Sequence, residues 1–332
     1  MTAPMDVPGD AVQAEPEAVL AGMGKAIEGR SLRQIAWMRL RRDRVAMVGG
    51  IVVAILVVTA AVAFVLDRVF GIIPTATFNQ SLIDPDLQIP KGPLGGISAD
   101  HPLGVEPVNG RDLLARIFAG SWVSLLIAFL STVMSVVIGT VLGVVAGFFG
   151  GWVDTLISRL MDVFLAFPLL LFALALAGVV PDNAFGLSGD ALRIALLIFI
   201  IGFFNWSYIG RIIRGQTLSL REREFVDAAR SLGARAPHIL FRELLPNLAA
   251  PILVYSTLLI PTNVLFESAL SFLGVGVRPP TPTWGGMLSD ATQYYQIDPE
   301  FMLVPGLAIF ITVLAFNLFG DGLRDALDPR AR

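Results

Sequence analysis

The sequence has 332 residues, of which 55% are hydrophobic and 15% charged, and it contains no cysteine. A soluble domain has about 45–50% apolar and about 25% charged residues. The composition therefore excludes a soluble enzyme, a disordered chain and a disulfide scaffold, because long uncharged stretches carry the apolar excess. Without cysteine there is no thiol nucleophile, thiolate metal site or redox pair, and with two histidines we expect no metal centre.

The first 44 residues precede any stretch long enough to cross a membrane. Residues 1–30 are rich in alanine, proline and acidic residues without an apolar run, which predicts a disordered cytoplasmic tail rather than a signal peptide. Residues 31–44 alternate arginine with isoleucine, tryptophan, methionine and leucine. This pattern predicts a basic interfacial helix held by anionic lipid. A nucleic-acid site is disfavoured, because the segment runs straight into an apolar stretch.

Six largely uncharged stretches are long enough to cross a membrane, which takes about 20 apolar residues. They lie at 45–66, near 122–149, and at 163–181, 194–210, 248–266 and 301–320. We therefore predict an all-α polytopic membrane protein with six transmembrane helices. After the first span (45–66) we expect a loop at 67–116, a core with five further spans at 117–320 and a tail at 321–332.

The basic residues are unevenly distributed between the two sides of these spans. Of the 24 Lys and Arg residues, 18 lie before the first span, between the second and third, between the fourth and fifth, or after the sixth. Lysine and arginine accumulate in the cytoplasmic loops of membrane proteins. We therefore expect both termini and the 211–247 loop to be cytoplasmic, and the 67–116 loop to be extracytoplasmic.

The predicted spans contain almost no ionisable residues, and the two candidates, Asp162 and Glu267, lie at span ends. Secondary transporters and proton pumps normally carry charged residues inside the membrane. A transporter with these spans therefore takes its energy from outside the membrane. The chain also has no catalytic motif and no phosphate-binding loop, since Gly24 and Lys25 are followed by Ala26. We predict no catalytic residue in this chain and any ATPase on a separate polypeptide.

Small residues and prolines mark the contacts and irregularities of the spans. Gly139, Gly143 and Gly147 recur every four residues, which predicts close approach of another helix. Prolines inside helices loosen the hydrogen-bond ladder. Three prolines lie inside the predicted spans: Pro168, Pro261 and Pro305. Hinges of a moving transporter and static kinks are equally compatible with them.

Two titratable residues are expected to be structural. We predict that His101 makes a structural hydrogen bond, and that Glu267 packs against a partner helix rather than binding cargo. The remaining polar candidates within the spans are Asn205, Tyr208, Thr257, Thr262, Asn263 and Asn317. Which of these face a transport pathway stays open.

The 211–247 loop carries a helix–corner–helix pattern. Phe225, Ala228, Ala229 and Leu232 fall at helical spacing and predict one apolar face, and Gly233 can end that helix in the left-handed conformation. The small residues of this face could fit into a groove on a partner protein. A solvated hairpin without a partner is an equally good interpretation of the pattern.

A second helix is predicted after the corner. Pro237 can begin it, Pro246 is expected to close it, and Asn247 is a candidate N-cap for the fifth span.

Asp227-Ala228-Ala229, followed by Gly233 and Leu245-Pro246, resembles the EAA loop of ABC importer permeases. In that family the loop forms the coupling helix that inserts into the ATPase subunit. Two positions depart from the pattern: Asp227 stands in place of the usual Glu, and Glu243 in place of Ile. The resemblance implies that the contact with the ATPase is made by six residues: Asp227, Ala228, Ala229, Gly233, Leu245 and Pro246.

Other blocks narrow the resemblance to dipeptide, oligopeptide and nickel permeases of the DppC/OppC type. These blocks are His101-Pro102-Leu103-Gly104, Gly110-Arg111-Asp112, Ser121-Trp122-Val123-Ser124-Leu125-Leu126, 267–276, 279–285, 305–310 and 320–329. The resemblance covers roughly residues 31–330 and implies the type I ABC importer permease fold.

This family implies a second, homologous permease subunit and two cytoplasmic P-loop ATPase domains, which bind ATP and Mg²⁺, so that no cofactor belongs to this chain. It also implies an extracytoplasmic substrate-binding protein and a location in the bacterial or archaeal cytoplasmic membrane. The candidate docking loop for the binding protein contains Gly274, Gly276, Pro280, Trp284 and Gly285. Peptides are the expected cargo, with a nickel chelate or other small solute as the alternative. From other classes, an ion-coupled secondary carrier or channel and a membrane scaffold remain alternatives.

Overall fold

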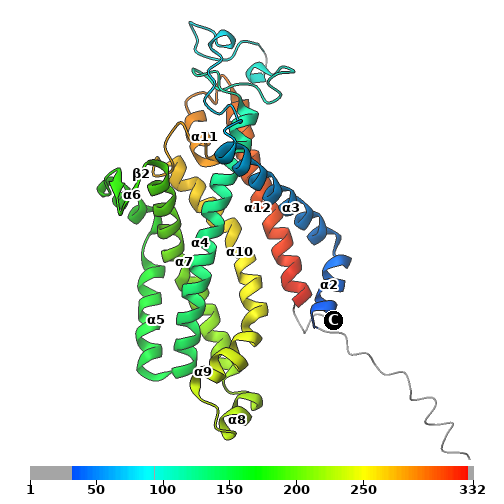
Figure 1. The fold of residues 1–332 in the computed structure, drawn as a ribbon, viewed down its shortest axis with the longest axis vertical. Coiled ribbons are helices and arrows are strands. Elements are labelled where there is room, and N and C mark those ends of the chain that lie inside the picture. Colours follow the sequence, from blue (N-terminus) through cyan, green and yellow to red (C-terminus); the bar gives the residue numbers. More distant parts are fainter. Residues whose placement is uncertain (1–31, 93, 328–332) are drawn as a thin grey trace, which may run out of the picture.

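The computed structural model describes residues 32–92 and 94–327, so the predicted tail at 1–30 and the last five residues of the 321–332 tail lie outside the described residues. Nearly all of the regular secondary structure in this part of the chain is helical (Figure 1). The helices are α2 (Leu32–Arg42), α3 (Arg44–Phe64), α4 (Leu113–Phe149), α5 (Gly151–Ala166), α6 (Leu169–Val179), α7 (Gly189–Leu220), α8 (Glu224–Ser231), α9 (Ala236–His238), α10 (Leu245–Phe272), α11 (Trp284–Ala291) and α12 (Pro299–Leu327). A two-stranded antiparallel sheet pairs β1 (Asn183–Ala184) with β2 (Leu187–Ser188).

Five of the described helical segments are long and apolar enough to cross a membrane. They are Arg44–Val69, Leu113–Phe149, Gly189–Leu220, Ala236–Phe272 and Pro299–Leu327. A bent pair, Gly151–Ala166 with Leu169–Leu176, passes the same test as one unit and would bring the number of spans to six. The structure therefore agrees with five of the predicted spans and leaves the sixth as a broken helix.

The prediction of one continuous span at 163–181 is wrong. The chain bends by 78° between α5 and α6, at Phe167 and Pro168. Phe167 has an extended backbone (φ −81°, ψ 128°), as expected for a residue that precedes proline. Because Pro168 has no N–H to donate, the helix ends before it and a new one starts after it.

Helix α4 is the central element, and it packs along α7 through the predicted glycine ridge. A Cβ atom at Gly139 would lie 2.6 Å from the carbonyl oxygen of Trp206, and one at Gly143 would lie 2.6 Å from that of Gly210. Gly147 is in similarly close contact with α7. The predicted close approach is confirmed, since any side chain at these positions would force the two helices apart.

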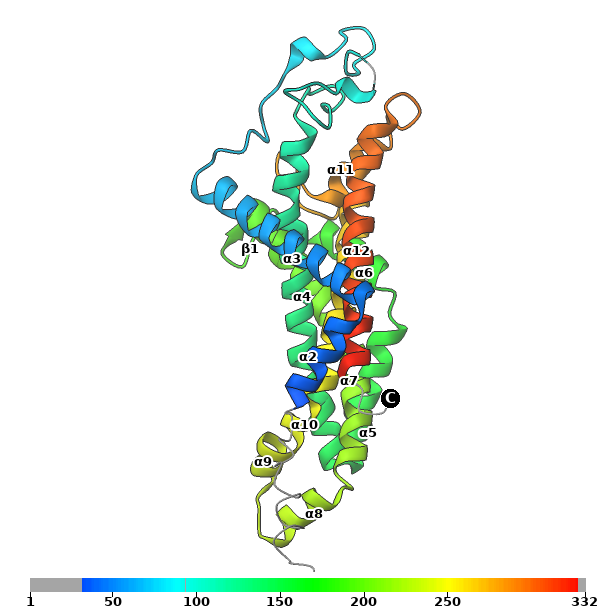
Figure 2. The same cartoon turned by 90° about the vertical axis from the view of Figure 1, so that its right-hand side faces the viewer.

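Helices α2 and α3 meet at a capped corner. Asp43 Oδ1 accepts hydrogen bonds from the amides of Val45 (2.9 Å) and Ala46 (3.0 Å), which fixes the start of α3. Helix α3 then crosses α12 obliquely (Figure 2), where a Cβ at Gly322 would lie 2.1 Å from that of Ala46. A helix does form over most of the predicted 31–44 segment, and its contact with lipid remains a prediction.

The two ends of the bundle differ in structure. Residues 70–112, which we call the cap, lie with α11 at one end (Figures 1 and 2). Residues 224–244, which we call the helical hairpin, contain α8, α9 and the turns around them and lie at the other end. Helix α7 continues to Leu220, so residues 211–220 belong to a span helix and not to the predicted 211–247 loop.

Candidate functional site

The corner of the helical hairpin is built on Gly233. This residue has φ +81°, and an added Cβ would meet nothing within 4 Å, so backbone conformation alone explains the glycine. The amide of Ala234 donates to the carbonyl of Ala229 (3.0 Å), and that of Leu232 donates to Ala228 (3.0 Å). The first of these bonds is typical of the Schellman cap, in which a left-handed residue closes a helix. The predicted helix end at Gly233 is confirmed.

The buried face of α8 is centred on Val226. Val226 is completely buried and packs with Ile239 and Leu244 of the second arm and with Phe148 at the end of α4. Phe225 and Ala229 are only half-buried at the edge of this cluster. The predicted apolar face of Phe225, Ala228, Ala229 and Leu232 is therefore largely left outside the cluster, because α4, far away in the sequence, covers the opposite side of this short helix.

The residues left outside form an exposed tip. Leu232 is 89% exposed, and Asp227 and Ala228 are also exposed. Arg230 donates to Asp227 across one turn (3.1 Å), a surface ion pair of the kind that contributes little to stability. A large apolar side chain held in water beside a small residue is suited to contact with another protein.

The second arm continues into the membrane-spanning helix without a break, contrary to the prediction that Pro246 closes it. Residues Ala236–Phe272 form one helical segment, with a wider π-type turn at Ile239–Leu244 just before Pro246. Asn247 donates its side-chain amide to the carbonyl of Glu243 (2.6 Å), so it lies inside the helix and is not an N-cap. Displacement of the helical hairpin would therefore be carried directly into α10.

The remaining two residues of the predicted coupling motif lie on this arm. Pro246 is exposed, and Leu245 is half-buried in the wall of an apolar groove of about 350 Å³ between α4 and the arm, together with Val141 and Phe241. The motif thus extends from α8 to the start of α10, with its acidic and small residues on α8 and its leucine against α4.

Two arginines anchor the base of the helical hairpin. These contacts were not predicted from the sequence. Arg221 donates to the carbonyl of Gly147 (2.9 Å), and Arg214 donates through Nη2 to Asp154 (2.7 Å). These bonds join the end of α7 to the ends of α4 and α5. The sequence signal, two arginines and an aspartate at span ends, was visible, but their pairing depends on the three-dimensional arrangement.

The predicted docking loop lies at the cap end and is only partly accessible. Gly274 and Pro280 are exposed, whereas Gly276, Trp284 and Gly285 are buried. A Cβ at Gly285 would lie 2.4 Å from the carbonyl oxygen of Ser268. These three buried residues hold the loop against α10 and do not themselves offer a surface.

Two bonds to α4 fasten the same loop. Trp284 donates its indole N–H to the carbonyl of Ile117 (3.1 Å), and Arg116 donates to that of Pro280 (3.2 Å). The loop is therefore continuous with the packing of the bundle.

Glu267 lies directly beneath this loop and is completely buried. Its carboxylate accepts hydrogen bonds from the hydroxyls of Ser271 (2.8 Å) and Ser268 (3.4 Å). Both hydroxyls belong to the helix of Glu267 itself, so these bonds do not show the predicted contact with a partner helix, which stays a prediction.

Among the polar residues of the spans, Asn205, Asn263 and Thr132 form a ladder across three helices. Asn205 donates to Asn263 (2.8 Å), which donates to Thr132 (2.8 Å). Within the described parts of the chain, no group of three or more His, Asp or Glu side chains is arranged to hold a metal ion.

Comparison with known families gives two matches that together cover most of the chain. Residues 139–332 match the family described as binding-protein-dependent transport system inner membrane component. Residues 31–87 match the N-terminal transmembrane domain of oligopeptide transport permease C. The second match ends within the cap, and the first begins in the glycine ridge of α4.

Curated relatives match nearly the full length. A dipeptide transport system permease protein DppC from Alkalihalophilus pseudofirmus is 38% identical over 90% of this chain and 90% of its own. A glutathione transport system permease protein GsiD from Shigella flexneri is 40% identical over 89% of this chain and 90% of its own. Its counterpart from Salmonella typhimurium is 41% identical over the same shares.

A solved structure shows the same fold. It is a chain of the inward-facing MetNI methionine ABC transporter, with a TM-score of 0.52 and 18% identity, and the match covers 65% of this chain and 98% of that one. Taken with the family matches, this likeness supports the predicted fold. The chain therefore belongs to the family of binding-protein-dependent transport system inner membrane components, as a permease subunit of an ABC importer of the dipeptide, glutathione and oligopeptide type.

Proposed function

We propose that this chain forms half of the translocation pathway of an ATP-driven importer of di- and oligopeptides. In this proposal the helical hairpin lies in the cytoplasm and docks on a separate ATPase, which binds the ATP and Mg²⁺. A second, homologous permease completes the pathway, and an extracytoplasmic binding protein delivers the cargo. The complex works in the cytoplasmic membrane of a bacterium or archaeon.

The observation that carries this proposal is the combination of an exposed tip with a continuous helix. Leu232 and Ala228 are exposed on α8, while Val226 beneath them is fully buried against the second arm. That arm runs without interruption into α10. A closing movement of an ATPase dimer that pulls on the tip would move α10, and with it the pathway, because the arm and α10 are one helix. ATP would drive this movement by binding the closed dimer more tightly than the open one.

Peptides are the cargo favoured by the relatives. The names of the curated relatives specify dipeptide and glutathione transport, and glutathione is itself a short peptide. The spans offer amide and hydroxyl groups such as those of Asn205, Tyr208 and Thr262. Such groups can hydrogen-bond the polar backbone that all peptides share, whatever their side chains. A nickel chelate or another small solute is the alternative within the same family.

Reconstitution tests the proposal. The chain is purified with its partner permease, the two ATPase domains and the binding protein, and is placed in liposomes. We expect ATP-dependent uptake of labelled dipeptide and stimulation of ATP hydrolysis by the loaded binding protein. Uptake by this chain alone along an ion gradient would indicate a secondary carrier, and a complex without substrate-dependent ATP hydrolysis would indicate a scaffold.

A further inference from the structure

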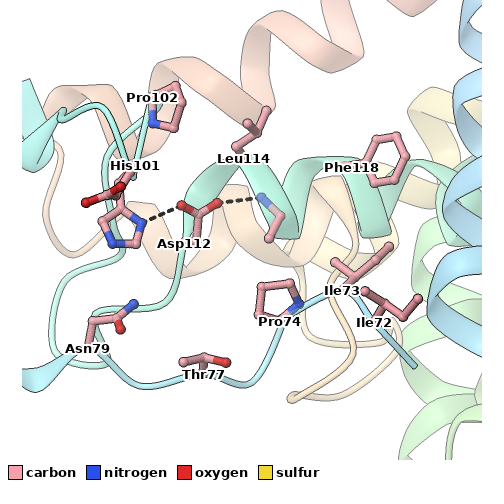
Figure 3. A pocket seen from close by; sticks show the side chains of 12 residues that line it. Ile72, Ile73, Pro74, Thr77, Asn79, His101, Pro102, Asp112, Leu114 and Phe118 are labelled. Carbon is pink, nitrogen blue, oxygen red and sulfur yellow. Dashed lines mark hydrogen bonds and ion pairs between the residues drawn. The ribbon is translucent and has the colours of Figure 1, made fainter. Parts of the chain in front are cut away.

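The cap contains a pocket of about 590 Å³ (Figure 3). Two separate segments form it, residues 72–79 on one side and residues 100–118 on the other. Figure 3 shows Ile73, Pro74 and Phe118 grouped on one side of the pocket and His101 with Asp112 on the other. The pocket is therefore amphipathic, with an apolar wall facing a charged rim.

The charged rim consists of Asp100, His101 and Asp112. Asp112 uses both oxygens within the chain: Oδ1 accepts the amide of Ala115 (2.6 Å), and Oδ2 lies 2.6 Å from His101 Nδ1. This contact confirms the structural hydrogen bond predicted for His101. Asp100 is exposed, so its carboxylate is accessible to a molecule that enters the pocket.

The charge of the cap favours a basic partner. Its acidic residues are Asp84, Asp86, Asp100, Glu106 and Asp112, and its basic residues are Lys91 and Arg111. Glu106 is buried and paired with Arg111 (2.6 Å), and with Arg116 of α4, so the cation of Arg111 is already used. The accessible carboxylates of the cap therefore outnumber its accessible cations, and this sign imbalance attracts positive groups.

The pocket is also connected to the helical hairpin. Asp112 caps α4, and Leu114 and Phe118 on the first turns of α4 line the pocket. The other end of the same helix places Phe148 in the buried cluster under α8. A group bound in the pocket would thus touch one end of α4, while the helical hairpin packs on the other.

We infer that this pocket receives a lysine or arginine side chain of the extracytoplasmic binding protein, an inference that rests on the proposed function. The aliphatic stem of the side chain lies against Ile73, Leu114 and Phe118, and its cation lies beside the exposed carboxylate of Asp100, while Asp112 stays paired with His101. Lysine and arginine combine an apolar stem with a charged head, which matches the two sides of the pocket. The 274–285 loop is a poorer anchor, because Gly276, Trp284 and Gly285 are buried.

The test measures how much binding protein gives half-maximal stimulation of ATP hydrolysis by the reconstituted complex. Asp100→Lys reverses the charge of the rim, and Leu114→Trp fills the pocket. Asp86→Lys and Leu87→Trp are the matched controls, since both residues are exposed on the cap and do not line the pocket. Basal ATP hydrolysis without binding protein reports that each variant is folded and assembled.

We expect Asp100→Lys and Leu114→Trp to raise the half-maximal concentration at least tenfold and the two controls to change it less than twofold. Asp100→Asn should also make the half-maximal concentration less dependent on salt, since salt screens the attraction between exposed charges. If the binding protein stimulates the wild type, and both pocket variants have the wild-type half-maximal concentration, the pocket assignment is overturned and the proposed function is not. Pocket variants that raise the KM for peptide while binding-protein affinity stays constant would also overturn the pocket assignment, because the pocket would then hold peptide. A wild type that the binding protein does not stimulate would overturn the proposed function and, with it, this inference.

Discussion

The cap and the helical hairpin lie at opposite ends of α4 and are stabilised in different ways. In the cap, buried charges join segments: Glu106, 1% exposed, pairs with Arg111, and Arg116 links this pair to the 274–285 loop. In the helical hairpin, one apolar cluster around Val226 and a glycine corner hold two short helices, and the ion pair is on the surface. The cap is therefore joined to α4 and the 274–285 loop through buried charges, whereas the helical hairpin relies on apolar packing and leaves its tip exposed.

The largest expected effect is at the centre of the helical hairpin. Val226→Asp places an unpaired carboxylate in a fully buried site, which costs at least about 3 kcal/mol and should unfold the helical hairpin. We expect protease cleavage between residues 221 and 245 in membranes and loss of the copurifying ATPase, with the cap unaffected. Ser231→Asp, at an exposed position of the same helix, is the control. An intact, ATPase-bound Val226→Asp variant would contradict the described packing.

The second-largest effect is expected from Asp298, a buried carboxyl at the cap end of the bundle. Asp298 is 3% exposed, and neither of its carboxylate oxygens has a hydrogen-bond partner. Burial, assisted by the neighbouring Glu300, raises the pKa of Asp298 from 3.8 to about 6. A carboxyl whose pKa is raised on folding stabilises the protein below its unfolded pKa, and this contribution is lost as the pH rises through the folded pKa.

Asp298→Asn should therefore stabilise the protein by about 2–3 kcal/mol at pH 8 and by less at pH 5. The wild type should lose thermal stability between pH 5 and pH 8, and the variant should lose less. The midpoint of thermal unfolding in detergent at the two pH values is the measurement. An equal pH dependence in both proteins would show that Asp298 is not the responsible group.

A substitution at Gly233, the corner of the helical hairpin, should cost less folding free energy but have a large effect on transport. Gly233→Val forces a β-branched residue into a left-handed conformation, at a cost of about 1–2 kcal/mol, with no steric clash to add. We expect the variant to insert and to hydrolyse ATP while peptide uptake falls. Gly233→Asn is the matched control, because asparagine tolerates this conformation and should retain most of the uptake. Normal uptake by Gly233→Val would contradict the coupling role.

The sequence predicts regular features well, because they depend on local pattern. The glycine ridge of α4 and the left-handed corner at Gly233 follow from residue types and spacing alone. Features that depend on distant residues could not be derived in this way. The break at Pro168 was expected only as a kink, and Pro246 does not end its helix because a wider turn precedes it. The buried face of α8 is set by Phe148, near the end of α4 and far from α8 in the sequence.

The smallest expected effect concerns the surface ion pair of the tip. Arg230 lies 3.1 Å from Asp227, and their side chains are 44% and 65% exposed. Helix-surface pairs three or four residues apart contribute about 0.2–0.5 kcal/mol, so Arg230→Ala should lower the unfolding free energy by no more than that. Thermal unfolding of the detergent-solubilised protein measures it. Because the pair barely stabilises the helical hairpin, a clear loss of ATPase binding in Arg230→Ala would place Arg230 in the contact itself. A loss of stability comparable to that of Val226→Asp would instead mean that surface charges hold the helical hairpin as buried charges hold the cap.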